Sequence, residues 1–142
     1  MCIAVRTMVS RSPAICRTRS GGAAALVARA SSERVLGPVI AAVEDGAFEL
    51  DDETMLQAVI GHQGSMLWCL QLELRLLEIK DWFRESGGVE FLVVKGPAVA
   101  HLDEPDPSLR SFADIDLLIH ERDMDRAIAT LISDLADRGL SD

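Results

Sequence analysis

Apolar residues recur at three- and four-residue steps between residues 33 and 88, which is the spacing of amphipathic helices. The first predicted helix follows the N-cap candidates Ser31, Ser32 and Glu33, so we expect order to begin near Ser32. A second predicted helix opens at the acidic residues 51–53, because negative side chains favour the N-terminal end of a helix dipole. Residues 33–88 are therefore predicted to be a helical lead-in.

The clearest helical pattern covers about residues 65–86, after Gly61 and Gly64, which we expect to interrupt the preceding helix. Gly87 and Gly88 then supply the glycines that commonly end helices. A broad apolar stripe on one side of a helix is typical of a face packed on the core, so we predict that this one is buried. The stripe consists of Leu67, Leu70, Leu74, Leu77 and Trp82.

From residue 89 the pattern changes to short β-branched and aromatic runs separated by turns and one more helix. The alternation predicts the start of a mixed α/β domain over residues 89–142, of the α/β (α+β) class. Two strands do not make a stable sheet alone, so we expect an incomplete sheet whose unpaired edge supports a homo- or hetero-oligomer. The predicted elements are a strand at 89–94, a short helix at 98–102, a proline-containing loop at 103–107, a strand at 114–120 and a helix at 123–137.

Composition divides the chain near residue 32. Residues 1–32 contain five arginines and no acidic residue, whereas the remainder contains 9 basic and 23 acidic residues. A body this acidic repels a phosphate backbone, which argues against non-specific binding to nucleic acid. We interpret residues 1–32 as a disordered tail or a start assigned too far upstream, although organellar transit peptides share this composition.

The three cysteines, Cys2, Cys16 and Cys69, are widely spaced and form no C-x-x-C motif. They support neither a zinc site nor a disulfide framework, and we expect a reducing, cytoplasmic setting. Cys69 lies within a helical apolar pattern and is predicted to be a small buried residue. No apolar run approaches the roughly 20 residues that a membrane span requires.

Two carboxylates in the second predicted strand are the main candidates for chemistry. In an extended strand, Asp114 and Asp116 share one face, while Ile115, Leu117 and Ile119 share the other and suit a core. Adjacent carboxylates repel each other, and a divalent cation removes that cost. Mg²⁺ is usually held by one or two carboxylates together with substrate phosphates, so this pair predicts a magnesium site.

A bare Asp-x-Asp is more often a pair of solvated carboxylates than a metal site, and neighbouring residues change that balance. Lys95 follows a buried strand directly, and Gly96 leaves room for a phosphate to approach the backbone. Arg110 precedes the carboxylates by four residues and has the geometry to bind an anion through two hydrogen bonds. The three histidines show no metal-like spacing, and His101 stands closest to the proposed site.

Three stretches, at residues 93–102, 105–110 and 113–119, carry a family resemblance. They resemble the uncharacterised nucleotidyltransferase family of the polymerase-β-like superfamily, over about residues 62–138. The resemblance implies that Asp114 and Asp116 are the catalytic, metal-binding carboxylates. It also implies that the nucleotide-binding residues are Lys95 and Gly96, in the nucleotide-contacting turn, and Arg110.

Members of that superfamily carry a third acidic residue on a later strand, commonly the base that activates the attacking hydroxyl. This chain ends at Asp142, directly after the predicted helix that leads toward that strand. Asp134 and Asp137 fall on that helix and do not take its place. We therefore interpret the chain as a C-terminally truncated member.

The resemblance implies transfer of a nucleotidyl group from a nucleoside triphosphate to an acceptor hydroxyl, with Mg²⁺ as cofactor. Whether this chain is an enzyme stays open at this point, because the third carboxylate is not among its residues. The alternative is a non-catalytic module, degenerate or truncated, that binds nucleotide or another protein. The sequence does not identify the acceptor or the base of the nucleotide.

Overall fold

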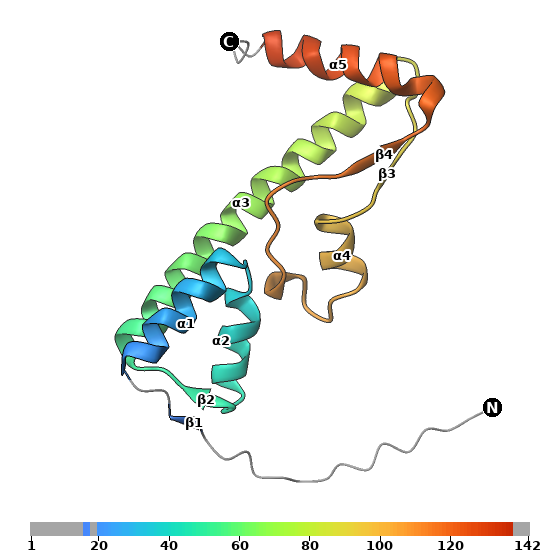
Figure 1. The fold of residues 1–142 in the computed structure, drawn as a ribbon. Coiled ribbons are helices and arrows are strands. Elements are labelled where there is room, and N and C mark those ends of the chain that lie inside the picture. Colours follow the sequence, from blue (N-terminus) through green and yellow to red (C-terminus); the bar gives the residue numbers. More distant parts are fainter. Residues whose placement is uncertain (1–15, 18–19, 138–142) are drawn as a thin grey trace, which may run out of the picture.

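A single long helix organises the molecule in the computed structural model, which describes residues 16–17 and 20–137. This helix, α3, spans Asp52–Glu85 (Figure 1). Helices α1 (Ser20–Ser32) and α2 (Leu36–Glu44) pack on each other and on its N-terminal half. Helix α5 (Met124–Asp137) contacts its other end.

The β structure is small and divided between two places. Strand β1 (Cys16–Arg17) pairs in parallel with β2 (Phe48–Glu49), and β3 (Phe91–Val93) pairs antiparallel with β4 (Leu117–Ile119). Between β3 and β4 lie helix α4 (Pro97–Leu102) and the 3₁₀ helix η1 (Pro107–Leu109), and a second 3₁₀ helix, η2 (Glu121–Asp123), follows β4. The predicted class, helices combined with an incomplete sheet, is confirmed.

The start of the helical part differs from the prediction. Ser31 and Ser32 end helix α1 instead of capping the next helix, and order in the described chain begins before Ser32. Val35 precedes α2 without a side-chain cap, and Arg34 makes the turn between the helices with a φ of +59°. The capping prediction failed because a serine pair that follows an alanine-rich helical stretch suits a helix end as well as a start. The interpretation of residues 1–32 stays a prediction for residues 1–15 and 18–19, which lie outside the described residues, whereas residues 20–32 form α1.

Helix α3 begins where the acidic run predicted a helix and then continues through both glycines. Asp51 caps it, because its carboxylate accepts hydrogen bonds from the Thr54 amide and hydroxyl, both at 2.9 Å, and these bonds lower the pKa of Asp51. The predicted interruption at Gly61 and Gly64 was wrong. A helical glycine costs only about 1 kcal/mol relative to alanine, and packing outweighs that cost. At Gly61 an added Cβ would meet Leu36 at 3.1 Å, so the glycine lets α2 approach closely.

The predicted burial of the leucine face of α3 was also wrong. The four leucines at 67, 70, 74 and 77 have 53–64% of their surface exposed, and only Trp82 is partly buried. The face that packs inward contains Ala58, Cys69 and Phe83. Because α3 is apolar on more than one side, its periodicity alone does not show which side meets the core.

Three clusters of buried residues hold the elements on α3. The first joins α1, α2 and the N-terminal half of α3 around Ala58, and the second joins α3 and α5 around Phe83. Leu117 and Ile119 pack against the second cluster, as their strand alternation predicted, and Phe83 meets Phe91 edge to face at 5.6 Å. The third cluster, which is built on Cys69, lies beside the candidate site. Within the described chain, no helix combines the length and apolar composition needed to span a bilayer.

Candidate functional site

The pairing of β3 with β4 brings the predicted lysine to one of the two predicted carboxylates. Val93 lies opposite Leu117, and the Val94 amide donates a hydrogen bond of 3.1 Å to the carbonyl of Asp116. The next residue, Lys95, places its Nζ 3.4 Å from Oδ2 of Asp116. The predicted convergence of Lys95 and Asp116 is therefore present in the structure.

The carboxylates themselves lie just outside the strand. The predicted strand at 114–120 is shorter in the structure, because β4 begins at Leu117 and leaves Asp114 and Asp116 in the segment that leads into it. The reason is the partner strand, since β3 ends at Val93 and the chain turns away at Gly96. Both aspartates consequently sit in a connecting segment at the end of the sheet.

Gly96 packs directly on the backbone of this segment. Its φ of +53° is one that L side chains rarely adopt, and an added Cβ would lie 2.9 Å from the carbonyl oxygen of Asp114. The ring of Phe112 would be 3.4 Å away on another side. The glycine is therefore needed for the contact between the Lys95–Gly96 turn and Asp114, and its predicted contact with nucleotide stays a prediction.

Helix α3 anchors the residues that precede the carboxylates. The indole Nε1 of Trp68 donates to the carbonyl of Ala113 at 3.3 Å. The neighbouring Cys69 thiol accepts from the Phe112 amide at 3.2 Å and donates to the Phe112 carbonyl at 3.4 Å. Burial raises the pKa of Cys69, so the thiol keeps the proton that the second bond requires. Cys69 is buried as predicted, but its link to a segment more than 40 residues away left no local pattern in the sequence.

The acidic pair is open to solvent. The side chains of Lys95 and Asp116 are 74% and 42% exposed, and Asp114 is exposed as well. An ion pair at this exposure contributes at most about 1 kcal/mol, so Lys95 is free to leave Asp116 for a bound anion. Within residues 16–17 and 20–137, no third His, Cys, Asp or Glu joins the pair in a group able to hold a metal. Two carboxylates that are completed by substrate phosphates still fit the usual coordination of Mg²⁺.

The remaining candidates lie in different settings. Arg110 follows η1 and is exposed, and its guanidinium forms no ion pair with a described residue. His101 is paired with Glu73 of α3 at 2.8 Å, so its side chain links α4 to α3. His120 accepts a hydrogen bond from the Arg122 amide and caps η2.

A hollow of about 360 Å³ adjoins the segment before Asp114. Its wall includes Ala113, Arg34 and Trp68, with the small residues of α3 leaving space between them. Trp68 is about half exposed, and Arg34 forms no ion pair with a described residue. Nothing in the sequence pattern singled out these two residues, because Arg34 lies in the turn between α1 and α2, Trp68 lies on α3, and they meet only in the fold.

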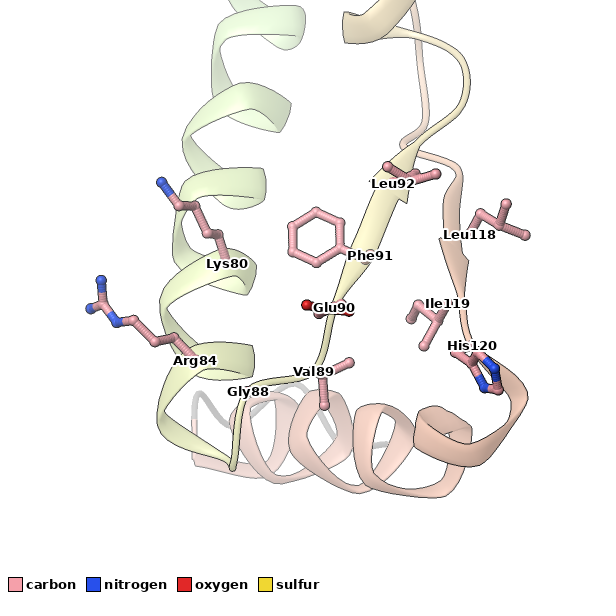
Figure 2. A pocket seen from close by; sticks show the side chains of 10 residues that line it. All are labelled: Lys80, Arg84, Gly88, Val89, Glu90, Phe91, Leu92, Leu118, Ile119 and His120. Carbon is pink, nitrogen blue, oxygen red and sulfur yellow. The ribbon is translucent and has the colours of Figure 1, made fainter.

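A larger apolar groove of about 1060 Å³ lies toward the other end of the strands. Figure 2 shows it beside α3 and the two strands, with Phe91 pointing toward the helix and Leu118 pointing away from it. Lys80 and Arg84 of α3 contribute its basic groups. None of the predicted site residues lines this groove, so the acidic pair belongs to a separate site.

Fold and site together describe a helical protein with a small antiparallel sheet. At the end of this sheet Lys95 contacts the carboxylate of Asp116, and the glycine turn packs on the backbone of Asp114. This combination is nucleotidyltransferase-like. The sequence model of the uncharacterised nucleotidyltransferase family matches residues 22–134, which is well over half of the chain. The chain therefore belongs to this family. The match begins earlier than the resemblance predicted and includes α1 and α2. Searches with the chain found no significant match among curated proteins or solved structures.

Proposed function

We propose that this protein binds a nucleoside triphosphate with Mg²⁺ at Asp114 and Asp116 and transfers the nucleotidyl group to an acceptor hydroxyl. The observation that carries the proposal lies at the end of the β3–β4 pair, where Lys95 contacts the Asp116 carboxylate and Gly96 packs on the backbone of Asp114. Membership of the nucleotidyltransferase family supports the same chemistry. In this reaction the acceptor oxygen forms a bond to the α-phosphorus, and the bond to the departing pyrophosphate breaks.

Each residue of the site has a distinct task in this proposal. Asp114 and Asp116 would hold Mg²⁺, which neutralises phosphate charge when it is bound. Lys95 is exposed enough to exchange its contact with Asp116 for a phosphate oxygen. Gly96 keeps the lysine turn against the backbone of Asp114, so the cationic and anionic parts of the site hold a fixed spacing. Arg110 supplies further positive charge from the chain just before the carboxylates.

The hollow beside Ala113 is the proposed place for the nucleoside. Trp68 presents an aromatic surface there, and bases stack on exposed aromatic rings. Arg34 adds a guanidinium that is not engaged by a described acidic residue. Trp68 also donates a hydrogen bond to the carbonyl of Ala113, which directly precedes Asp114. A ligand in this hollow would therefore lie beside the residue next to Asp114.

Calorimetry with Mg²⁺ and each of the four nucleoside triphosphates tests the binding step. We expect the wild-type chain to bind at least one of them, and D116A to bind it more weakly, because the variant removes one of the two carboxylates that would hold Mg²⁺ with the phosphates. The matched control is D125A, which removes an exposed carboxylate from the start of α5. Unchanged affinity in D116A, or equal loss in D125A, would contradict the proposal.

Fluorescence tests the nucleoside position separately. The chain has two tryptophans, so W82F leaves Trp68 as the only indole. We expect nucleoside triphosphates to quench Trp68 emission through base stacking, whereas inorganic tripolyphosphate, which has no base, leaves it unchanged. Equal responses to both ligands would contradict the placement of the base in this hollow. They would leave the assignment of the carboxylates unaffected.

A second candidate function is nucleotide binding without transfer. It is favoured by the absence of a third metal-binding carboxylate beside Asp114 and Asp116 within the described part of the chain. The two functions differ in pyrophosphate release, which accompanies transfer and is absent when the nucleotide only binds. Measuring pyrophosphate after incubation with Mg²⁺, a bound nucleoside triphosphate and a cell extract that supplies acceptor hydroxyls, against the D114N/D116N variant as background, therefore separates them.

A further inference from the structure

The outward face of α3 carries large apolar side chains in a regular order. We call these six residues the leucine stripe, and each has more than half of its surface exposed. Together with two polar residues, Gln63 and Asp81, they follow one another at alternating steps of four and three residues. This is the heptad spacing of helices that pack along their length. The leucine stripe consists of Leu56, Ile60, Leu67, Leu70, Leu74 and Leu77.

This face points away from the rest of the molecule. Leu72, which packs against the Cys69 cluster, is two residues from both Leu70 and Leu74, and two residues correspond to about 200° around a helix. In Figure 1 α4 and the β3–β4 pair lie along one side of α3, and Leu72 packs on that side against the Cys69 cluster. Contiguous exposed apolar surface of this extent commonly marks a site of protein association.

The central leucines and the two polar residues are arranged symmetrically about position 72. Leu70 and Leu74 lie two residues on either side of position 72, and Leu67 and Leu77 lie five residues on either side. The positions nine residues away on either side are both polar, Gln63 and Asp81. The face is therefore symmetric over residues 63–81, although not beyond them, where Ile60 corresponds to Arg84. A symmetric segment of this kind can pair with a second copy of itself through a twofold axis.

We propose that α3 packs antiparallel against α3 of a second copy of this chain, with the twofold axis crossing the leucine stripe between Leu70 and Leu74. In this arrangement the four central leucines bury one another, and the amide of Gln63 donates a hydrogen bond to a carboxylate. The contacts are Leu70 with the partner's Leu74, Leu67 with the partner's Leu77, and Gln63 with the partner's Asp81.

Charge selects the antiparallel orientation over the parallel one. A parallel pair would place Asp81 against the partner's Asp81 inside the interface, where two carboxylates repel. The antiparallel pair places the partner's Gln63 opposite Asp81 instead.

Sedimentation of the full chain tests the assembly. We expect the wild type to be a dimer and L70E to be a monomer with unchanged helical circular dichroism. A dimer of L70E would bury one glutamate charge from each copy in the interface. L102E is the matched control, since Leu102 is the most exposed of the large apolar residues described and lies on α4, outside the leucine stripe. A monomeric wild type, or a dimeric L70E, would overturn the proposal.

Cross-linking tests the orientation and does not depend on whether L70E folds. Cys2 and Cys16 are replaced by serine, and L67C and L77C chains are mixed under oxidising conditions. We expect a disulfide between an L67C chain and an L77C chain, and no disulfide between two L67C chains. Preferential self-coupling of L67C would show a parallel pair, and no cross-linking in any mixture would show that another partner covers this face; either result contradicts the proposal.

Discussion

At the residue scale, the site depends on contacts between residues that are distant in sequence. Asp114, Asp116 and Lys95 were predicted as a group from strand alternation and resemblance, and the structure brings Lys95 and Asp116 within 3.4 Å. Trp68 and Cys69 were not predicted as site residues, because only the fold places them against residues 112–113. Local pattern identifies groups that share a strand end, and it carries no signal for hydrogen bonds between remote segments.

Gly96 provides the sharpest test at this scale. We expect G96A to lower the free energy of unfolding by about 1–3 kcal/mol more than G46A does. Both glycines have positive φ, but an added Cβ meets the carbonyl of Asp114 at position 96 and nothing within 4 Å at position 46. Urea unfolding of the two variants measures the difference. Equal losses would mean that the close contact with Asp114 contributes nothing beyond backbone strain.

At the scale of elements, α3 shows what helical periodicity can and cannot predict. Its acidic start and its glycine end were predicted correctly, because both are local features of helix termini. Its continuity through Gly61 and Gly64 was not predicted. The propensity cost of a helical glycine, about 1 kcal/mol, is smaller than the stabilisation that a long helix gains by packing against its neighbours. Its buried face was assigned to the wrong side, because several sides are apolar and only neighbouring elements decide among them.

The two helical glycines form a matched pair for testing that interpretation. We expect G64A to raise the free energy of unfolding by about 0.5–1 kcal/mol, because alanine is the better helix former and nothing lies near the added methyl group. We expect G61A to gain less or to lose stability, because its methyl group would meet Leu36 at 3.1 Å. Equal gains in the two variants would show that α2 adjusts freely against α3.

At the scale of the whole molecule, α3 separates two surfaces with different chemistry. One side carries α4, the β3–β4 pair and the acidic site, and the other carries the leucine stripe. The mixed class and the incomplete sheet were predictable from the order of patterns along the chain. The arrangement around one helix was not, because it depends on how α3 continues through its glycines. A dimer through the leucine stripe would leave both acidic sites facing away from the interface.

The central claim is that Asp114 and Asp116 bind a divalent cation together with nucleotide beside the Lys95–Gly96 turn. Mn²⁺ takes the same oxygen ligands as Mg²⁺, and its unpaired electrons broaden the NMR signals of nearby nuclei. In a ¹⁵N-labelled chain with the nucleoside triphosphate that calorimetry identifies, we expect small amounts of Mn²⁺ to broaden the amide signals of Gly96, Asp114 and Asp116. The amide of Gly46 should stay sharp, and D114N/D116N should abolish the broadening. Broadening centred elsewhere, or broadening that survives in the double variant, would contradict the account.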